Sequence, residues 1–254
     1  MTDYDSFEEF RDPATYDLEC EYVDEELPLI ERWARALGGP VLDLACGTGR
    51  TGLRLAAAGY QVTGVDLMPE MVAFGRAKAA AQNVTMEWLV ADARVFQLDA
   101  RFGLAYMIGN AFQMFWTRAD QEALLARVRE HLRPDGCFLF ETRNPSPRNL
   151  DPSPRPPSEY ATPGGGQLVI RYEPRVYDAM AQIQHWTSHY EWRRADAQRA
   201  EETRRIALRY VYPQELDALL HYNGFQIRAS YGSWQGDPLT AESEEMIVVC
   251  ERRG

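Results

Sequence analysis

From residue 41 onward the sequence alternates between short apolar runs and segments with helical periodicity, and this alternation restricts the fold more than any other feature. The strand-like runs lie at 41–45, 61–66, 85–92, 104–109 and 137–142. Helical patterns separate them around 50–58, 69–82 and 118–132. Strands that alternate with helices of this length are typical of βαβ crossovers and a mostly parallel sheet. The sequence therefore predicts an α/β fold, a Rossmann-like three-layer sandwich.

The segments on either side of this region differ from it in composition and hydrophobic pattern, so the chain divides into four segments. We expect an N-terminal acidic cap with a helix (1–37), the ligand-binding core (38–145), a Pro/Gly-rich loop with an antiparallel β insertion as a lid (146–212), and a C-terminal completion of the core sheet (213–254). The prolines after 145 exclude a helix or a central strand there. Alternating patterns predict the lid strands around 168–177, 181–192 and 203–212, and final strands at 225–230 and 246–251.

Charge and composition exclude several classes of partner. The chain has 27 Lys and Arg against 38 Asp and Glu, and twelve of the acids fall within its first 31 residues. No basic surface of the kind that binds nucleic acid is indicated. No apolar run reaches the ~18 residues of a membrane span, and no secretory signal is evident. We expect a cytoplasmic monomer or homodimer, without nucleic acid or membrane partners. The four cysteines are widely spaced, which argues against disulfides and a metal cluster.

The most informative stretch runs from Val41 to Arg50, where a strand passes through a glycine turn into a helix. Gly47 and Gly49 let the backbone approach a ligand where a Cβ would collide. With Gly52 they also match G-x-G-x-x-G, the dinucleotide pattern, and Asp66 ends the next strand, where it could hold a ribose. An NAD(P)-dependent oxidoreductase is therefore one possible reading of this turn.

Asp43 distinguishes between the two ligand classes. It lies inside the first strand, four residues before Gly47, so its carboxylate is expected near the same turn. A pyrophosphate would meet a like charge there, whereas the ammonium and sulfonium of S-adenosylmethionine would be attracted. The ribose hydroxyls of that ligand suit Asp66, and its adenine amine suits Asp92 at the end of the third strand. The carboxyl ends of parallel strands meet at one edge of a sheet, so three acids there predict one crevice for this cofactor.

With these residues in place, the chain resembles the class I S-adenosylmethionine-dependent methyltransferases. The resemblance rests on D-L-A-C-G-T-G at 43–49, V-T-G-V-D at 62–66, V-A-D-A at 90–93, G-N-A-F-Q at 109–113 and L-R-P-D-G at 132–136. The tail is similar to the small-molecule branch, which includes sugar N-methyltransferases and glycine-type N-methyltransferases. The resemblance implies a seven-stranded sheet whose last two strands form an antiparallel hairpin.

The resemblance also implies roles for individual residues. The first acid engages the methionyl amine, directly or through water, and the glycine turn lies under the methionyl and ribose parts. The second acid binds the ribose hydroxyls and the third pairs with adenine. Apolar walls follow the second acid, and an N-terminal tyrosine closes over the cofactor. The predicted cofactor residues are Tyr16, Asp43, Ala45, Cys46, Gly47, Gly49, Asp66, Leu67, Met71, Asp92, Ala93, Ile108 and Gly109.

Position along the chain suggests the residues near the point of transfer. The catalytic candidates are Asn110, Gln113, Glu141 and His185, with Arg143 as an acceptor contact. Met114 stands where some relatives have a histidine, so the identity of a base is open. His185 and His189 would share a metal on a helix, but strand spacing puts them about 13 Å apart. We expect no metal.

These residues favour transfer of a methyl group to an N or O atom of a small molecule such as an amino sugar, an amine or a secondary metabolite. The reaction is an in-line displacement that needs alignment and exclusion of water rather than a covalent intermediate. Arginines interleaved with acids between 193 and 209 are expected to form a solvated hairpin, with a phosphate-bearing acceptor such as a nucleotide sugar as the alternative. An oxidoreductase, or a protein that binds S-adenosylmethionine without turnover, are the competing functions.

Overall fold

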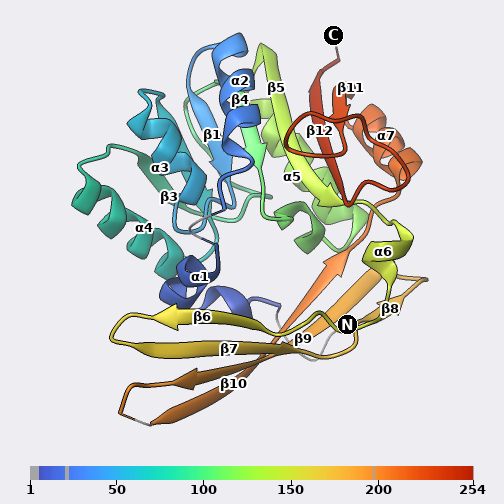
Figure 1. Cartoon of the computed structure of the whole chain (residues 1–254). Coiled ribbons are helices and arrows are strands. Elements are labelled where there is room, and N and C mark those ends of the chain that lie inside the picture. Colours follow the sequence, from blue (N-terminus) through green and yellow to red (C-terminus); the bar gives the residue numbers. More distant parts are fainter. Residues whose placement is uncertain (1–5, 21–22, 197, 254) are drawn as a thin grey trace.

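The computed structural model describes residues 6–20, 23–196 and 198–253, and Figure 1 shows a helix-flanked core above a smaller antiparallel sheet. The core strands are β1 (Val41–Leu44), β2 (Val62–Asp66), β3 (Glu87–Val90), β4 (Phe102–Met107), β5 (Leu132–Arg143), β11 (Phe225–Tyr231) and β12 (Glu245–Arg252). Its helices are α2 (Leu27–Leu37), α3 (Arg50–Ala57), α4 (Pro69–Gln82), α5 (Arg118–His131) and α7 (Pro213–Tyr222), with the 3-10 helix η2 (Ala111–Met114).

The remaining elements form a cap and a lid. The cap comprises η1 (Glu8–Phe10) and α1 (Pro13–Cys20); residues 1–5 and 21–22 of the expected cap lie outside the described residues. The lid is a sheet of β6 (Ser158–Thr162), β7 (Gly166–Tyr172), β8 (Val176–Asp178), β9 (Ile183–Arg193) and β10 (Arg199–Arg209), preceded by the short helix α6 (Pro147–Leu150).

The large sheet has the order β11-β12-β5-β4-β1-β2-β3. The strands from β1 to β5 pair in parallel, and β12 runs antiparallel to both of its neighbours. This arrangement confirms the predicted Rossmann-like fold, the seven strands and the antiparallel final pair. The carboxyl ends of the parallel strands point toward the lid, which is where a crossover sheet of this kind binds its ligand.

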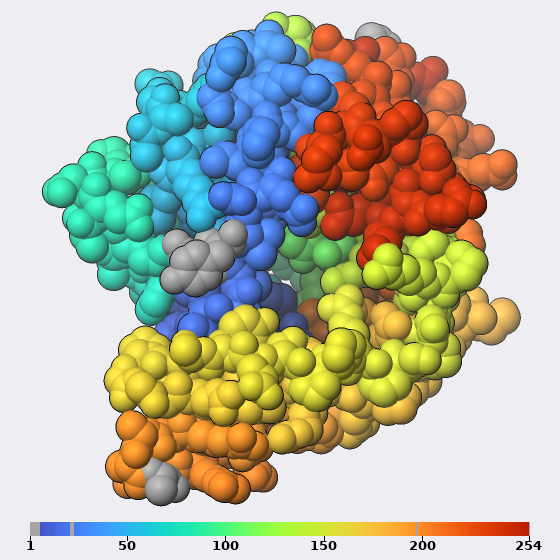
Figure 2. Space-filling model, in the orientation of Figure 1, coloured from blue at the N-terminus to red at the C-terminus, as the bar shows by residue number. Residues whose placement is uncertain are grey.

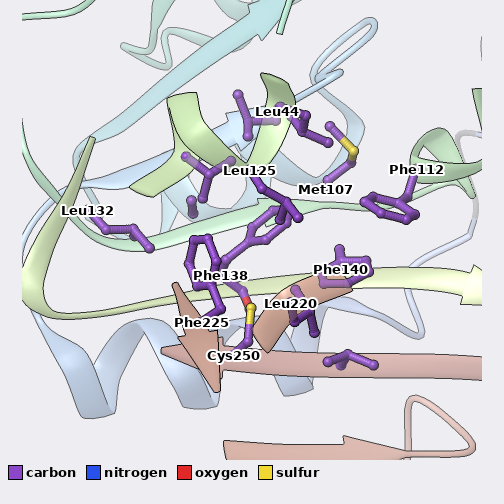
Figure 3. Packing of buried hydrophobic residues seen from close by; sticks show 14 of the residues in the cluster. Leu44, Met107, Phe112, Leu125, Leu132, Phe138, Phe140, Leu220, Phe225 and Cys250 are labelled. Carbon is purple, nitrogen blue, oxygen red and sulfur yellow. The ribbon is translucent and has the colours of Figure 1, made fainter. Parts of the chain in front are cut away.

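Two apolar layers hold the core, one on each face of the large sheet. Leu42 and Leu44 pack with α5 and α7 on one face, and Val41 packs with α2 and α3 on the other. Figure 3 shows the first layer, in which the rings of Phe138 and Phe140 lie among leucines from the covering helices. Central parallel strands are buried on both faces, which explains why their sequences are continuous apolar runs.

Two strand predictions were wrong in their boundaries. β5 begins at Leu132, five residues earlier than expected, because Pro134 and Gly136 interrupt the strand pattern in the sequence. The pairing with β4 is irregular between Phe102 and Leu104, and this irregularity accommodates the two residues. The run expected at 168–177 is two strands, β7 and β8, separated around Pro174. A proline breaks the ladder because it has no amide hydrogen to donate.

The proline-rich segment is more ordered than a loop. Pro147 occupies the first turn of α6, where its missing N–H costs nothing, and the Ser146 side chain caps that helix by accepting from the Asn149 amide. Further along, β6 contains no proline and pairs only with β7, at the edge of the lid. The prolines of this segment lie before and after β6, so they do not interrupt its pairing with β7.

The cap lies between the core and the lid, as the blue atoms above the yellow ones show in Figure 2. Asp17 of α1 forms an ion pair with Lys78 of α4 at 2.6 Å and accepts a hydrogen bond from Thr48 in the turn after β1. Glu8 of η1 accepts from the Arg205 amide on β10 at 2.7 Å. The cap is thus bonded to both layers. In the described part of the chain no helix is long and apolar enough to span a bilayer.

Candidate active site

A cavity of about 320 Å³ lies at the carboxyl ends of the core strands, between the core, the cap and the lid. This volume is within the range of small-molecule sites. Ten of the thirteen predicted cofactor residues line it, from the ends of β1, β2, β3 and β4 and from the cap. They are Tyr16, Ala45, Gly47, Asp66, Leu67, Met71, Asp92, Ala93, Ile108 and Gly109.

Asp66 lines the cavity and is hydrogen-bonded to the turns on either side of it. Its carboxylate accepts from the Gly47 amide at 2.7 Å and from the Met68 amide at 2.8 Å. Burial raises the pKa of Asp66, while the donated amides lower it in part. Gly47 has φ +55°, and a Cβ there would lie 3.3 Å from Met71 Cε and 3.8 Å from Tyr16 Cε1. The structure thus brings Tyr16 of the cap next to the glycine turn.

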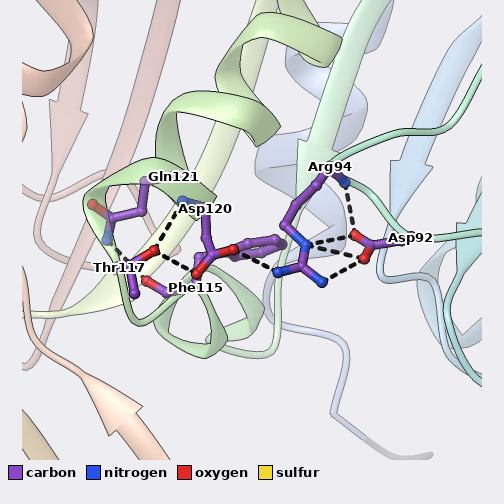
Figure 4. Close-up of polar contacts among 6 residues, drawn as sticks. All are labelled: Asp92, Arg94, Phe115, Thr117, Asp120 and Gln121. Atoms are coloured by element: carbon purple, nitrogen blue, oxygen red, sulfur yellow. Dashed lines mark hydrogen bonds and ion pairs between the residues drawn. The ribbon is translucent and has the colours of Figure 1, made fainter.

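Asp92 lies at the other end of the cavity in a charged bridge (Figure 4). Arg94 forms ion pairs with Asp92 at 2.6 Å and with Asp120 of α5 at 2.5 Å. The hydrogen bonds from Arg94 hold the pKa of Asp92 below its ordinary value. Asp92 therefore stays ionised where the adenine amine is expected. Arg94 and Asp120 also line the cavity, and sequence reasoning missed both.

Asp43, which is predicted to engage the methionyl amine, does not line the cavity. It is buried beneath the turn, paired in register with Gly64 and Tyr106, and a Cβ on Gly52 would lie 2.8 Å from its Oδ2. Burial raises the pKa of Asp43 to about 7, although the Tyr106 hydroxyl and the Gly52 amide favour its ionised form. The acid supports the turn from below, toward α3.

Cys46 and Gly49 also lie outside the cavity wall. Gly49 adopts φ +78° at the start of α3, and a Cβ there would lie 2.4 Å from Trp88. Cys46 is buried, with its Sγ 2.8 Å from where a Cβ on Gly64 would be. Burial raises the pKa of the Cys46 thiol well above its ordinary value, so the sulfur stays protonated. Both residues therefore shape the turn from outside the cavity wall.

Asn110 is the one catalytic candidate at the cavity, in the left-handed region at φ 58°. Its amide donates to Glu141 Oε1 at 2.9 Å. Its Oδ1 is buried and has no hydrogen-bond partner among the described residues. Buried polar atoms are normally paired, so this oxygen is free to accept from a ligand.

Glu141 and Gln113 support the cavity from behind rather than line it. Glu141 also accepts from Trp234 Nε1 at 3.2 Å, and burial raises the pKa of Glu141. Gln113 is buried and donates to the Arg209 carbonyl at 3.1 Å, which joins the core to the lid. The prediction that they act near the transfer point is therefore not supported by their positions.

His185 is not brought to the cavity either. Side chains alternate along β9, so Gln184, Trp186 and Ser188 are buried while His185 is only partly so. His185 points to the other face of the lid. His189 lies on that face too and contacts Glu173 at 2.7 Å. In the ranges that the structure describes, no group of three or more acid, His or Cys side chains is arranged to hold a metal ion.

The wall opposite the glycine turn is apolar, and sequence reasoning missed it. It comes from the cap, the segment around η2 and the lid strand β10. Its residues are Phe7, Phe10, Met114, Phe115, Trp116, Ile206 and Leu208. Their types do not differ from those of a hydrophobic core, so no chemical pattern in the sequence marked them as a ligand surface.

Comparisons with known proteins agree with this geometry. Residues 41–136 match the family described as a methyltransferase domain. A putative methyltransferase from Geobacillus sp. (strain WCH70) is 30% identical over 145 residues, which are 56% of this chain and 58% of that protein. The cypemycin N-terminal methyltransferase from Streptomyces sp is 27% identical over 224 residues, 85% of this chain and 84% of that protein.

Two solved structures share the fold over nearly the whole chain. The CcbJ methyltransferase from Streptomyces caelestis has a TM-score of 0.78 at 22% identity and covers 99% of this chain and 100% of its own. The sugar N-methyltransferase KedS8 from Streptoalloteichus sp ATCC 53650 has a TM-score of 0.77 at 20% identity, covering 94% and 93%.

The strand order, the glycine turn and the cavity beside it are those of a Rossmann-like fold with a ligand site at the carboxyl edge of its sheet. Residues 41–136 match a methyltransferase domain, and with its relatives the chain is similar to the class I S-adenosylmethionine-dependent methyltransferases. A structure of similar fold, the glycopeptide N-methyltransferase MtfA, is complexed with S-adenosyl-L-methionine; its TM-score is 0.57 at 23% identity. The matched methyltransferase domain favours a methyltransferase over the oxidoreductase alternative.

Proposed function

We propose that the enzyme transfers a methyl group from S-adenosylmethionine to an amine nitrogen of a small molecule, such as an amino sugar, a free amine or a secondary metabolite. The observation that carries this proposal is the composition of the cavity wall. Besides Tyr16, the ionisable residues that line the cavity are Asp66, Asp92, Arg94 and Asp120, all at the nucleoside end. Among the residues that the structure describes, the opposite wall is apolar and presents no general base.

An amine suits such a wall better than a hydroxyl does. A neutral amine presents its own lone pair, attacks the methyl carbon as the carbon–sulfur bond breaks, and afterwards loses its proton to solvent. A hydroxyl must lose its proton during attack, which requires a positioned base. Tyr16 cannot serve as one readily, because burial raises its pKa above the ordinary value. The relatives named above include N-methyltransferases, which supports the same choice.

Cofactor roles follow from the positions of the lining residues. Asp66 would hold the ribose hydroxyls and Asp92 the adenine amine, with Leu67, Met71 and Ala93 beside the base. Ala45, Gly47, Ile108 and Gly109 would flank the methionyl chain under Tyr16. The unpaired Asn110 Oδ1 would accept from an N–H of the methionyl ammonium or of the acceptor. Alignment of this kind supplies on the order of 7 to 11 kcal/mol toward the barrier.

A binding experiment and a turnover experiment test the proposal. Isothermal titration should show S-adenosylhomocysteine bound and NAD⁺ not bound. A panel of amino sugars, simple amines and their hydroxyl counterparts, incubated with S-adenosylmethionine, should then yield products one methylene heavier by mass spectrometry for amines. Methylation of the hydroxyl compounds alone would overturn the choice of nitrogen. Binding without any turnover would favour a protein that only senses the cofactor.

A further inference from the structure

Three arginines surround one tryptophan where the lid meets the core. The guanidinium carbons of Arg155, Arg143 and Arg175 lie 4.4, 4.9 and 5.3 Å from the centre of the Trp186 ring. Arg143 ends β5, Arg175 precedes β8, and Arg155 lies in the segment between α6 and β6 that crosses the seam in Figure 1. We call these three side chains and the indole the arginine cluster.

Among the described residues, none of the three guanidinium groups of the arginine cluster forms an ion pair with a carboxylate. Arg143 donates to Gln113 Oε1 at 3.3 Å and Arg175 to two backbone carbonyls at 3.4 Å, while Arg175 Nε is buried without a partner. Close positive charges without a counterion are costly. In a chain of net charge −11, such an excess calls for a ligand that supplies negative charge.

The surroundings hold the cluster in place. Trp186 is buried, and its Nε1 donates to Gln184 Oε1 at 2.8 Å, which fixes the indole. Glu9 of the cap, Glu141, Asp151 and Glu245 influence the cluster electrostatically, but in the described part of the chain none of these four acids forms an ion pair with it. Burial raises the pKa of Glu9 despite Arg143 and Arg155. Its capacity to neutralise the arginines is reduced accordingly. The cluster is open to solvent at Arg155, which is exposed.

The cluster also adjoins the acceptor side of the cavity. Trp186 packs in one apolar group with Ile206, Leu208, Phe10 and Met114, and these four residues all line the cavity. The indole therefore backs the apolar wall from behind, with the arginines around it. An acceptor amine at the cavity would place a charged substituent toward this edge.

We propose that the arginine cluster binds an oxyanion, a carboxylate or a phosphate, carried by the methyl acceptor. The proposal rests on the proposed function, which supplies the acceptor. Guanidinium groups present paired N–H donors that match both oxyanions, and stacking on an indole orients them in advance. The acceptor class is then an amine that also bears an anionic group, which binding of the cofactor alone does not require.

Pyrophosphate and succinate serve as separate probes for the two oxyanions. Each is titrated calorimetrically into the full-length protein and into Arg155→Gln and Arg175→Gln. The matched control is Arg148→Gln on α6, whose 77% exposed side chain pairs with Glu244. We expect binding of at least one probe, weakened about ten-fold by either cluster variant and unchanged in the control. Pyrophosphate alone would indicate a phosphate, and succinate alone a carboxylate.

Absence of binding by the unaltered protein, or equal binding by the cluster variants, would overturn the proposal. Titration of S-adenosylhomocysteine into the same samples separates this result from the proposed function. If the thioether binds all four proteins alike, failure of the probes concerns the cluster only. If it binds none, the proposed function fails whatever the probes do. With an anionic amine acceptor, the cluster variants should raise KM and leave kcat within about two-fold.

Discussion

At the scale of single residues, the glycine turn links backbone shape to cofactor binding. Gly47→Ala places a Cβ against Met71 and Tyr16 in a left-handed conformation, whereas Gly59→Ala has the same kind of φ, +94°, with nothing within 4 Å. Both variants should lose about 1 kcal/mol of stability from backbone strain. Only Gly47→Ala should weaken S-adenosylhomocysteine binding, by about ten-fold or more. Urea denaturation and calorimetry measure the two effects, and equal affinities would refute the expectation.

Asn110 permits a second test at this scale, because its φ of 58° is one that glycine adopts freely. Asn110→Gly removes the unpaired Oδ1 without straining the backbone. We expect kcat/KM to fall about ten-fold, since a hydrogen bond to a charged group contributes about 1.5 to 3 kcal/mol. The melting temperature should change little. Unaltered kinetics would show that this oxygen contacts neither the cofactor nor the acceptor.

The polar half of the site was predictable from the sequence, and the apolar half was not. Asp66 and Asp92 stand at strand ends with spacings that only a ligand explains, so their chemistry was visible. Phe10 and Ile206 are chemically ordinary and reach the cavity through packing of distant segments. Asp43 lies near the turn but outside the cavity wall, because its distance along the chain predicts proximity only, whereas the face of the strand toward which it points depends on the packing of α3.

At the scale of elements, the cap is held to the core chiefly through α1. Lys78→Met removes the ion pair with Asp17 and should increase the dissociation rate of S-adenosylhomocysteine several-fold, because Tyr16 on the same helix closes over the turn. Arg76→Met on the same helix α4 is the control, since Arg76 bonds to the Trp88 carbonyl and not to the cap. Stopped-flow displacement measures both rates. Equal rates for the two variants would contradict a closing role of α1.

Elements of the core were predicted well because their apolar periodicity matches their burial on both faces. The lid was predicted less accurately, since its strands are half-exposed and irregularly spaced. The clearest failure is the proline-rich segment, in which α6 and β6 escaped prediction. A four-residue helix and an edge strand depend on docking against neighbours rather than on local pattern.

At the scale of the whole molecule, several buried acids make stability depend on pH. Burial raises the pKa of Asp43, of Glu19 and of Glu245 to about 7 in each case. The folded protein therefore binds more protons than the unfolded chain between about pH 4 and pH 7. Stability should fall as pH rises through this window, since each unit of pKa difference corresponds to about 1.4 kcal/mol at most.

Urea denaturation at intervals from pH 5 to pH 8 measures this dependence. Glu19→Gln, which cannot ionise, should reduce the slope, whereas Glu130→Gln on the exposed side of α5 should not. A slope of the opposite sign, with stability increasing toward pH 8, would contradict the raised pKa values of the buried acids. The ion-paired Glu191 does not affect this range, because hydrogen bonds from Arg193 and Arg171 lower its pKa to about 2, so its stabilising contribution is constant above about pH 4.5 and is lost only below it.

Lys78 is the only lysine in the chain, so every other cation is an arginine. An amine-directed reagent can therefore modify one side chain only, and that ammonium is shielded while it contacts Asp17. The rate of its acylation thus reports how often the cap detaches, without any engineered probe. Saturation with the thioether product should slow the labelling, which makes the unaltered protein its own reporter of closure.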